Sequence, residues 1–156
     1  MIKLVLLFVA VSLCVTFPTI SFAVDAYLCL PHNTTGFNYD KNLGDWKTNN
    51  FGNRDKYIVS KSKLPGYAWK VTKYMKTAPI YVCEEDFNNS GYLFCEETGE
   101  FRMNKHNLRY IRTYILGYYN LNVKGDNGEV KPEEEGSSTP FIEIGKCSPL
   151  PKYHPK

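Results

Sequence analysis

The chain has 156 residues, of which 43% are hydrophobic and 15% aromatic, with 19 Lys and Arg against 16 Asp and Glu. This composition suits a single globular domain and excludes collagen-like, low-complexity and acidic disordered chains, because enough apolar side chain is present to build a core. The net charge of +3 is too small to indicate or exclude a polyanionic partner.

Residues 1–23 predict a secretory signal peptide. A single lysine precedes an apolar run from Leu4 to Val15, and Ser21 and Ala23 place small residues where a signal peptidase reads them. The run is shorter than the ~20 residues that a bilayer span needs. We therefore expect a periplasmic or secreted protein without a membrane span. Its mature chain begins at Val24, with a cut after Ala26 as the second choice.

The mature chain reads mainly as short strands. Tyr67, Trp69 and Val71 alternate with smaller or polar residues, and Tyr110–Tyr119 is rich in β-branched and aromatic side chains. Gly, Asn, Asp and Pro mark the turns between strands. The other candidate strands are Tyr27–Leu30, Gly36–Tyr39, Asp45–Thr48, Lys56–Ser60, Ile80–Glu84, Gly91–Glu96, Glu100–Asn104 and Pro140–Lys146.

This pattern predicts one all-β domain over residues 24–148, an antiparallel meander that forms a small barrel or a sandwich. The one helical candidate is a single turn near Asn104–Leu108. Residues 125–138 hold three glycines, three consecutive glutamates and no aromatic residue, and predict a long acidic loop. We favour a tolerated excursion over a lid or a partner-binding loop. Residues 149–156 predict a Pro-rich tail without secondary structure.

Four cysteines remain in the predicted mature chain, and an even count in an exported protein predicts two disulfides. Cys83 and Cys95 lie symmetrically about Asn89, in the middle of a predicted turn. A hairpin on that turn places the two cysteines directly opposite each other, ~4.5–5.5 Å apart at Cα, which is within disulfide range. The remaining pair is Cys29 with Cys147. A redox or metal site is disfavoured because no Cys-x-x-Cys motif is present.

The same hairpin register makes Glu84 and Glu96 diagonal neighbours, ~7–8 Å apart, which overlaps the carboxylate separation of inverting glycosidases. A hydrolase that uses this pair is therefore one alternative function. The acidic neighbours Glu85, Asp86 and Glu97 favour a solvated acidic face instead. We assign no catalytic residue and do not expect an enzyme.

The sequence predicts neither a cofactor nor a metal site. His32, His106 and His154 are not at metal-ligand spacing from one another. Clusters of Lys and Arg interleaved with aromatic residues are typical of single-stranded nucleic-acid binding. The predicted export argues against that reading, and we expect no nucleic-acid partner.

Binding without catalysis is the preferred hypothesis, with an unknown protein or envelope component as partner, in the manner of an inhibitor. A small-ligand-carrying β-barrel is the alternative. The candidate binding residues are Trp69, Tyr118 and Tyr119. An interior cavity lined by aromatic residues would favour the carrier, whereas a filled core with an exposed patch around Tyr118 and Tyr119 would favour the partner binder. The oligomeric state is not indicated.

Motifs along most of the mature chain carry a resemblance. They are Thr35–Asp40, Trp46-Lys47, Phe51, Lys56-Tyr57, Gly91–Cys95, Gly99–Asn104, Gly117–Tyr119 and Thr139–Leu150. With these motifs the chain resembles a family of small, uncharacterised exported proteins of Gram-negative bacteria and their prophages. The resemblance implies a periplasmic location. It implies no catalytic residue, because no activity is assigned to the family.

Overall fold

The computed structural model describes residues 25–52, 55–119, 122–124, 130–132, 136 and 138–151. The predicted signal peptide and its cleavage site lie outside the described residues, as do much of the predicted acidic loop and residues 152–156 of the predicted tail. Within the described part of the chain, no helix is long and apolar enough to cross a membrane.

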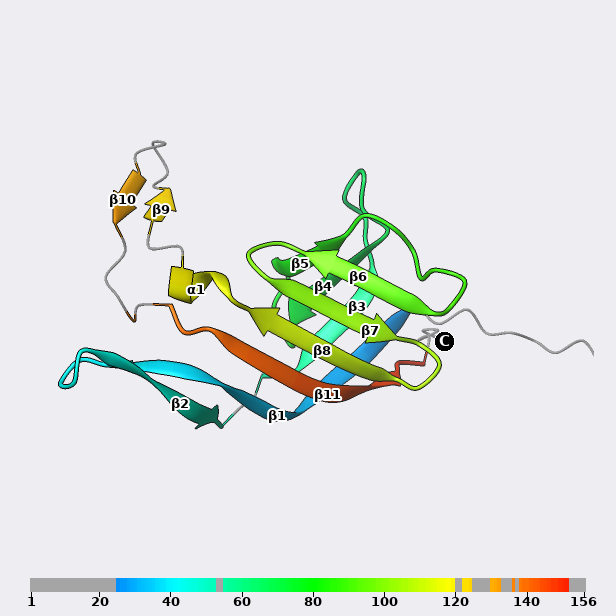
Figure 1. The fold of residues 1–156 in the computed structure, drawn as a ribbon. Coiled ribbons are helices and arrows are strands. Elements are labelled where there is room, and N and C mark those ends of the chain that lie inside the picture. The colour runs from blue at the N-terminus through cyan, green and yellow to red at the C-terminus, as the bar shows by residue number, and fades with distance from the viewer. Residues whose placement is uncertain are drawn as a thin grey trace, which may run out of the picture.

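Eight antiparallel strands close into a barrel, and a ninth strand extends it on one side (Figure 1). The all-β antiparallel prediction is confirmed, and the fold is a barrel and not a sandwich. Around the barrel the strands follow the order β1 (Ala26–Asp40), β3 (Tyr57–Lys61), β4 (Trp69–Lys73), β5 (Pro79–Cys83), β6 (Tyr92–Glu96), β7 (Glu100–Asn104), β8 (Arg109–Tyr114) and β11 (Phe141–Pro149), which pairs back onto β1.

Strand β1 is long enough to pair with two different strands along the same edge. Its segment Ala26–Cys29 pairs with β3, and its second half pairs with the extra strand β2 (Asp45–Phe51). The β1–β2 hairpin projects from the barrel as an arm (Figure 1). The sequence predicted two separate strands here. They are continuous because the polar residues between them pair with β11, through a register shift between Pro31 and Asn33.

Both predicted disulfides, Cys29–Cys147 and Cys83–Cys95, are present. Cys29 is the ladder partner of Cys147, so this bridge lies where β1 and β11 close the barrel. The turn before β6 is held by Asn88, whose side-chain oxygen accepts two backbone N–H hydrogen bonds. Two disulfides are compatible with an oxidising compartment.

The strand predicted over Tyr110–Tyr119 is too long. β8 ends at Tyr114, and Leu116–Tyr119 form one helical turn, α1. The reason is that β11 begins at Phe141, the partner of Tyr114, so later residues have no strand to pair with. The predicted helical turn at Asn104–Leu108 is instead a hydrogen-bonded turn between β7 and β8.

A short hairpin of β9 (Asn122–Lys124) and β10 (Val130–Pro132) follows α1. Strand β10 therefore falls inside the segment that the sequence predicted as a loop. In Figure 1, α1 and this hairpin lie beyond the same end of the barrel as the arm.

Large side chains fill the barrel interior. Tyr57, Phe101, Leu93, Met103 and the four bridged cysteines are all nearly or fully buried. An eight-stranded barrel has an interior just wide enough for such side chains. The end near the Cys29–Cys147 bridge also holds a cluster of Tyr27, Trp69 and Phe87, whose ring centroids are 5.1–6.0 Å apart.

Candidate functional site

Five large apolar side chains are exposed on the outside of the barrel where the arm leaves it. They come from β1, from β11 and from the segment that follows β8. They are Phe37 (48% exposed), Ile115 (65%), Tyr118 (63%), Ile142 (42%) and Ile144 (48%). We call these five residues the arm face.

The pairing of β1 with β11 brings the arm face together. Side chains alternate along a strand, so Ile142 and Ile144 share the outer face of β11. Thr35 on β1 is the partner of Ile142, and Phe37 is the next outward residue along β1. Phe37, Ile115 and Ile142 line a groove of about 300 Å³. Phe37, Ile115 and Ile142 therefore meet in a shallow apolar groove, with Ile144 beyond Ile142 on the same face of β11 and Tyr118 beside Trp46 on the arm.

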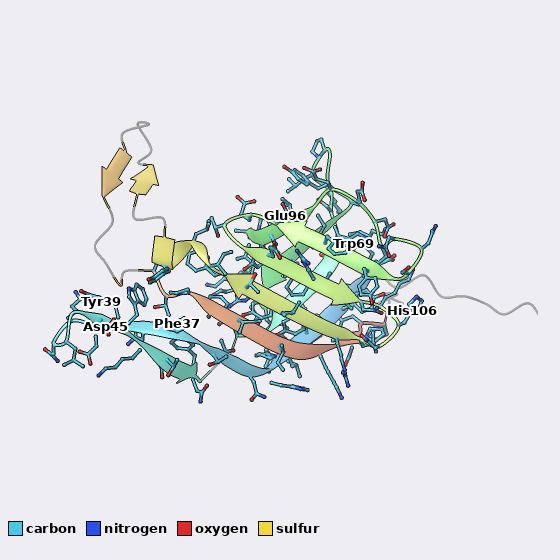
Figure 2. The ribbon with its side chains drawn as sticks, in the orientation of Figure 1. Phe37, Tyr39, Asp45, Trp69, Glu96 and His106 are labelled. Carbon is cyan, nitrogen blue, oxygen red and sulfur yellow. A yellow bond between two sulfur atoms is a disulfide. The ribbon has the colours of Figure 1, made fainter. Side chains whose placement is uncertain are left out.

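An aromatic contact fixes α1 against the arm. The ring centroids of Tyr39 and Trp46, which are partners in the β1–β2 ladder, lie 5.5 Å apart. Trp46 in turn makes an edge-to-face contact with Tyr118 at 5.6 Å. Figure 2 shows Phe37 and Tyr39 on the arm, in the region of α1. Edge-to-face packing of this kind gives Tyr118 a defined position although most of its surface is exposed.

The three candidate binding residues named from the sequence lie in different places. Tyr118 belongs to the arm face. The side chain of Tyr119 lies outside the described residues. Trp69 is buried in the core, where its indole N–H donates a hydrogen bond to Asp86 at 2.7 Å. Although burial opposes it, hydrogen bonding to Lys61 and Trp69 lowers the pKa of Asp86.

A pair of like charges borders the arm face. Arg109 on β8 and Lys146 on β11 are ladder partners, and both are exposed. Among the described residues neither forms an ion pair. Like charges directly opposite each other on a sheet are destabilising. The apolar surface therefore has a basic rim whose charge the described fold does not neutralise.

A buried carboxyl group lies on the inner side of the same strand. Glu143 is fully buried, and three hydroxyl groups donate hydrogen bonds to it: Tyr110 at 3.0 Å, Thr34 at 3.3 Å and Tyr57 at 3.4 Å. Burial raises the pKa of Glu143, and the positive charge of Arg112 opposes that rise. Burial also raises the pKa of Tyr57 and Tyr110.

Arg112 lies beside this carboxyl group and also lines a groove. Its Nε atom is 3.5 Å from Glu143 Oε1, and its guanidinium group lies 4.8 Å from the Tyr57 ring centroid and 4.6 Å from that of Phe141. Arg112 lines a groove of about 530 Å³, which we call the mouth groove. Its other lining residues are Thr34, Phe51, Gly52, Tyr114, Thr139 and Phe141.

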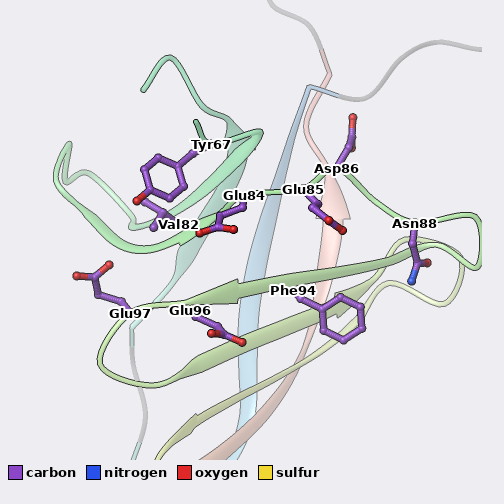
Figure 3. A pocket seen from close by; sticks show the side chains of 9 residues that line it. All are labelled: Tyr67, Val82, Glu84, Glu85, Asp86, Asn88, Phe94, Glu96 and Glu97. Atoms are coloured by element: carbon purple, nitrogen blue, oxygen red, sulfur yellow. The ribbon is translucent and has the colours of Figure 1, made fainter. Parts of the chain in front are cut away.

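The structure brings Glu84 and Glu96 to one acidic pocket of about 440 Å³. Figure 3 shows their carboxylates on facing sides of this pocket, with Glu85, Asp86 and Glu97 around it. Both Glu84 and Glu96 are exposed. A hydrolase that uses two carboxylates needs one of them in a site that keeps it protonated, usually by burial. The acidic pocket does not provide that burial.

In the part of the chain that the structure describes, no three His, Cys, Asp or Glu side chains are placed to hold a metal ion. Two lysines of the basic cluster over residues 61–76 pair with carboxylates: Lys61 with Asp86, and Lys73 with Asp55 at 2.7 Å. Lys61 also lies over the ring of Trp69. These lysines therefore have partners within the fold.

Sequence reasoning missed the isoleucines of the arm face and the pair Glu143–Arg112. The order Ile142-Glu143-Ile144 could have indicated both features. Side chains alternate along a strand, so either the two isoleucines or the glutamate must lie on the exposed outer face.

Comparisons of the chain with known protein families, with curated proteins and with solved structures find no match.

Proposed function

We propose that this protein is a non-catalytic, exported binding protein that docks a protein partner of the cell envelope through the arm face. The observation that carries the proposal is the exposure of five large apolar side chains on adjoining elements, by 42–65%. Large contiguous apolar patches on a folded surface mark interaction sites. The side chains that fill the barrel core support docking on the outside over carriage of a ligand enclosed in that core.

The basic rim indicates the chemistry of the partner. Arg109 and Lys146 face each other without a neutralising group among the described residues. A partner that carries carboxylates at the edge of its own apolar patch would neutralise both charges on binding. Complementary charges at the edge of an interface fix its register and speed association.

A second copy of this chain fits the surface less well. Symmetric pairing uses the same patch on both subunits. It would bring Arg109 and Lys146 of one copy against the same charges or against apolar side chains of the other. Neither arrangement neutralises them. We therefore expect the isolated protein to be monomeric.

Site-specific crosslinking tests the proposal. A photoreactive phenylalanine is placed at Ile142 in the arm face, or at Met75, which is 87% exposed in the turn after β4. The exported protein is irradiated in its own envelope extract. We expect one discrete adduct from position 142 that is missing from position 75. The mass of the adduct distinguishes a foreign partner from a second copy.

Charge reversal provides the second arm of this experiment. Lys146→Glu should reduce the adduct yield from position 142 at least several-fold, because it repels the carboxylates of the partner. Lys76→Glu, an exposed lysine after β4, is the matched control and should leave the yield unchanged. Three outcomes would refute the proposal. They are the same adducts from positions 142 and 75, an adduct of two copies of this chain, and equal adduct yields for the two charge variants.

A further inference from the structure

The mouth groove has the size and lining of a small-molecule site. Its volume of about 530 Å³ lies within the range of ligand pockets, roughly 300–1,000 Å³. Phe51, Tyr114 and Phe141 provide aromatic walls. They come from the end of the arm and from β8 and β11, where Tyr114 and Phe141 are ladder partners. The groove is therefore flat-walled and apolar on several sides.

Arg112 supplies the charge in this lining, and its hydrogen-bonding capacity is unused. The side chain is only 12% exposed. Its Nε atom is buried and has no hydrogen-bond partner. The guanidinium group makes no hydrogen bond with the described residues. Its contact with Glu143, 3.5 Å from Nε to Oε1, is an ion pair that is too long for a good hydrogen bond. A nearly buried group with five N–H donors is costly to leave unpaired.

Glu143 relieves Arg112 only in part, because its Oε1 lies 3.5 Å from Nε, too far for a good hydrogen bond, and its Oε2 accepts hydrogen bonds from Thr34 and Tyr57. Glu143 supplies a nearby negative charge, and the rings of Tyr57 and Phe141 hold the guanidinium plane. The result is a positioned cation at the base of an aromatic groove. A planar guanidinium group matches a carboxylate, which can accept two parallel N–H bonds.

We propose that the mouth groove binds a small aromatic carboxylate, whose carboxylate group contacts the Arg112 guanidinium and whose ring lies against Phe51, Tyr114 and Phe141. A monoanion fits better than a phosphate, because a doubly charged group would place extra negative charge beside Glu143. Arg112 lies on the inner side of the sheet and the arm face on the outer side, so the charged end of this site is separate from the docking surface, although Phe141 lines both grooves.

Indole-3-acetate and its neutral amide, indole-3-acetamide, are suitable probes, titrated calorimetrically into the full mature protein. Hydrogen bonds to charged groups favour the acid, so we expect it to bind at least tenfold more tightly than the amide. Phe51→Ala removes one wall and should weaken both probes by a similar factor. Because Phe51 lies at the end of β2 on the arm, this variant leaves the closed barrel intact.

The double variant Arg112→Gln/Glu143→Gln removes the cation without leaving a buried carboxylate unpaired, because an unpaired buried charge is strongly destabilising. It should abolish the preference for the acid. The control is Arg102→Gln, since Arg102 also lies over a ring, that of Phe94 at 5.6 Å, but on the outer face. It should keep the full preference.

Equal binding of acid and amide to the wild type would overturn the proposal, as would no binding of either probe at millimolar concentration. A preference that survives in the folded double variant would have the same consequence. If the double variant fails to fold, the wild-type ratio and the Phe51→Ala titration still decide the question. Loss of the preference in Arg102→Gln would place the site on the outer face and would also refute it.

Discussion

Replacing each disulfide by a pair of alanines should destabilise the protein to different extents. Cys29–Cys147 spans 118 residues and Cys83–Cys95 spans 12. In the chain-entropy model the long loop contributes ~4.9 kcal/mol and the short loop ~2.8 kcal/mol. All four cysteines are at most 3% exposed, so the cavities left by alanine are comparable. We expect the Cys29→Ala/Cys147→Ala variant to be less stable by about 2 kcal/mol.

The strand pairing gives the shorter bridge a separate local role. β1 and β11 are paired along a long ladder, whereas the pairing of β5 with β6 consists of Val82 with Glu96. Cys83–Cys95 therefore covalently joins a weakly paired seam of the barrel. Its removal should raise amide hydrogen exchange in β5 and β6 selectively, because local opening needs few hydrogen bonds to break.

Urea unfolding of the two double variants, followed by tryptophan fluorescence, gives the free energies, and native-state hydrogen exchange gives the local openings. Double replacements avoid mispairing by a single free thiol. If Cys83→Ala/Cys95→Ala proves the less stable variant at equilibrium, then the stabilisation of the β5–β6 pairing by its bridge exceeds the difference in loop-closure entropy, and the entropic reasoning is wrong.

Three further changes test other parts of the structure. Lys146→Glu places a negative charge opposite Arg109, so the free energy of unfolding in urea should rise by about 0.2–1 kcal/mol. A loss of stability would refute the claim that Arg109 and Lys146 repel each other without a neutralising group. Burial raises the pKa of Glu143 above its usual 4.5, so the folded state binds this proton more tightly and the stability that it contributes falls as pH rises through the folded value. The stability of the wild type relative to Glu143→Gln should therefore decrease with rising pH above about 4.5, and a constant difference between the two unfolding curves would contradict that sign. In Gly145→Ala the new Cβ would clash with the backbone carbonyl oxygen of Leu30 and with the Tyr110 ring, so thermal unfolding should show a loss of about 1–3 kcal/mol from overpacking. An unchanged midpoint would mean that both neighbours move aside without cost.

Much of the fold could be predicted from the sequence because the relevant signals are local. Period-two alternation and turn residues located most strands, since they depend on neighbours a few residues apart. The symmetry of Cys83 and Cys95 about Asn89 predicted one disulfide, and Cys29–Cys147 followed by elimination. The strand predicted over Tyr110–Tyr119 was too long, because its end depends on where a distant partner, β11, begins.

The two proposed binding surfaces were decided by tertiary structure alone. Alternation shows that Ile142 and Glu143 lie on opposite faces of a strand, but not which face the barrel encloses. Closure placed Glu143 inside, against hydroxyl groups that lie 33, 86 and 109 residues away in the chain. It left Ile142 outside beside Phe37. Which side chains meet thus depends on which strands become neighbours, and that is set by the curvature and closure of the whole sheet and not by any short segment.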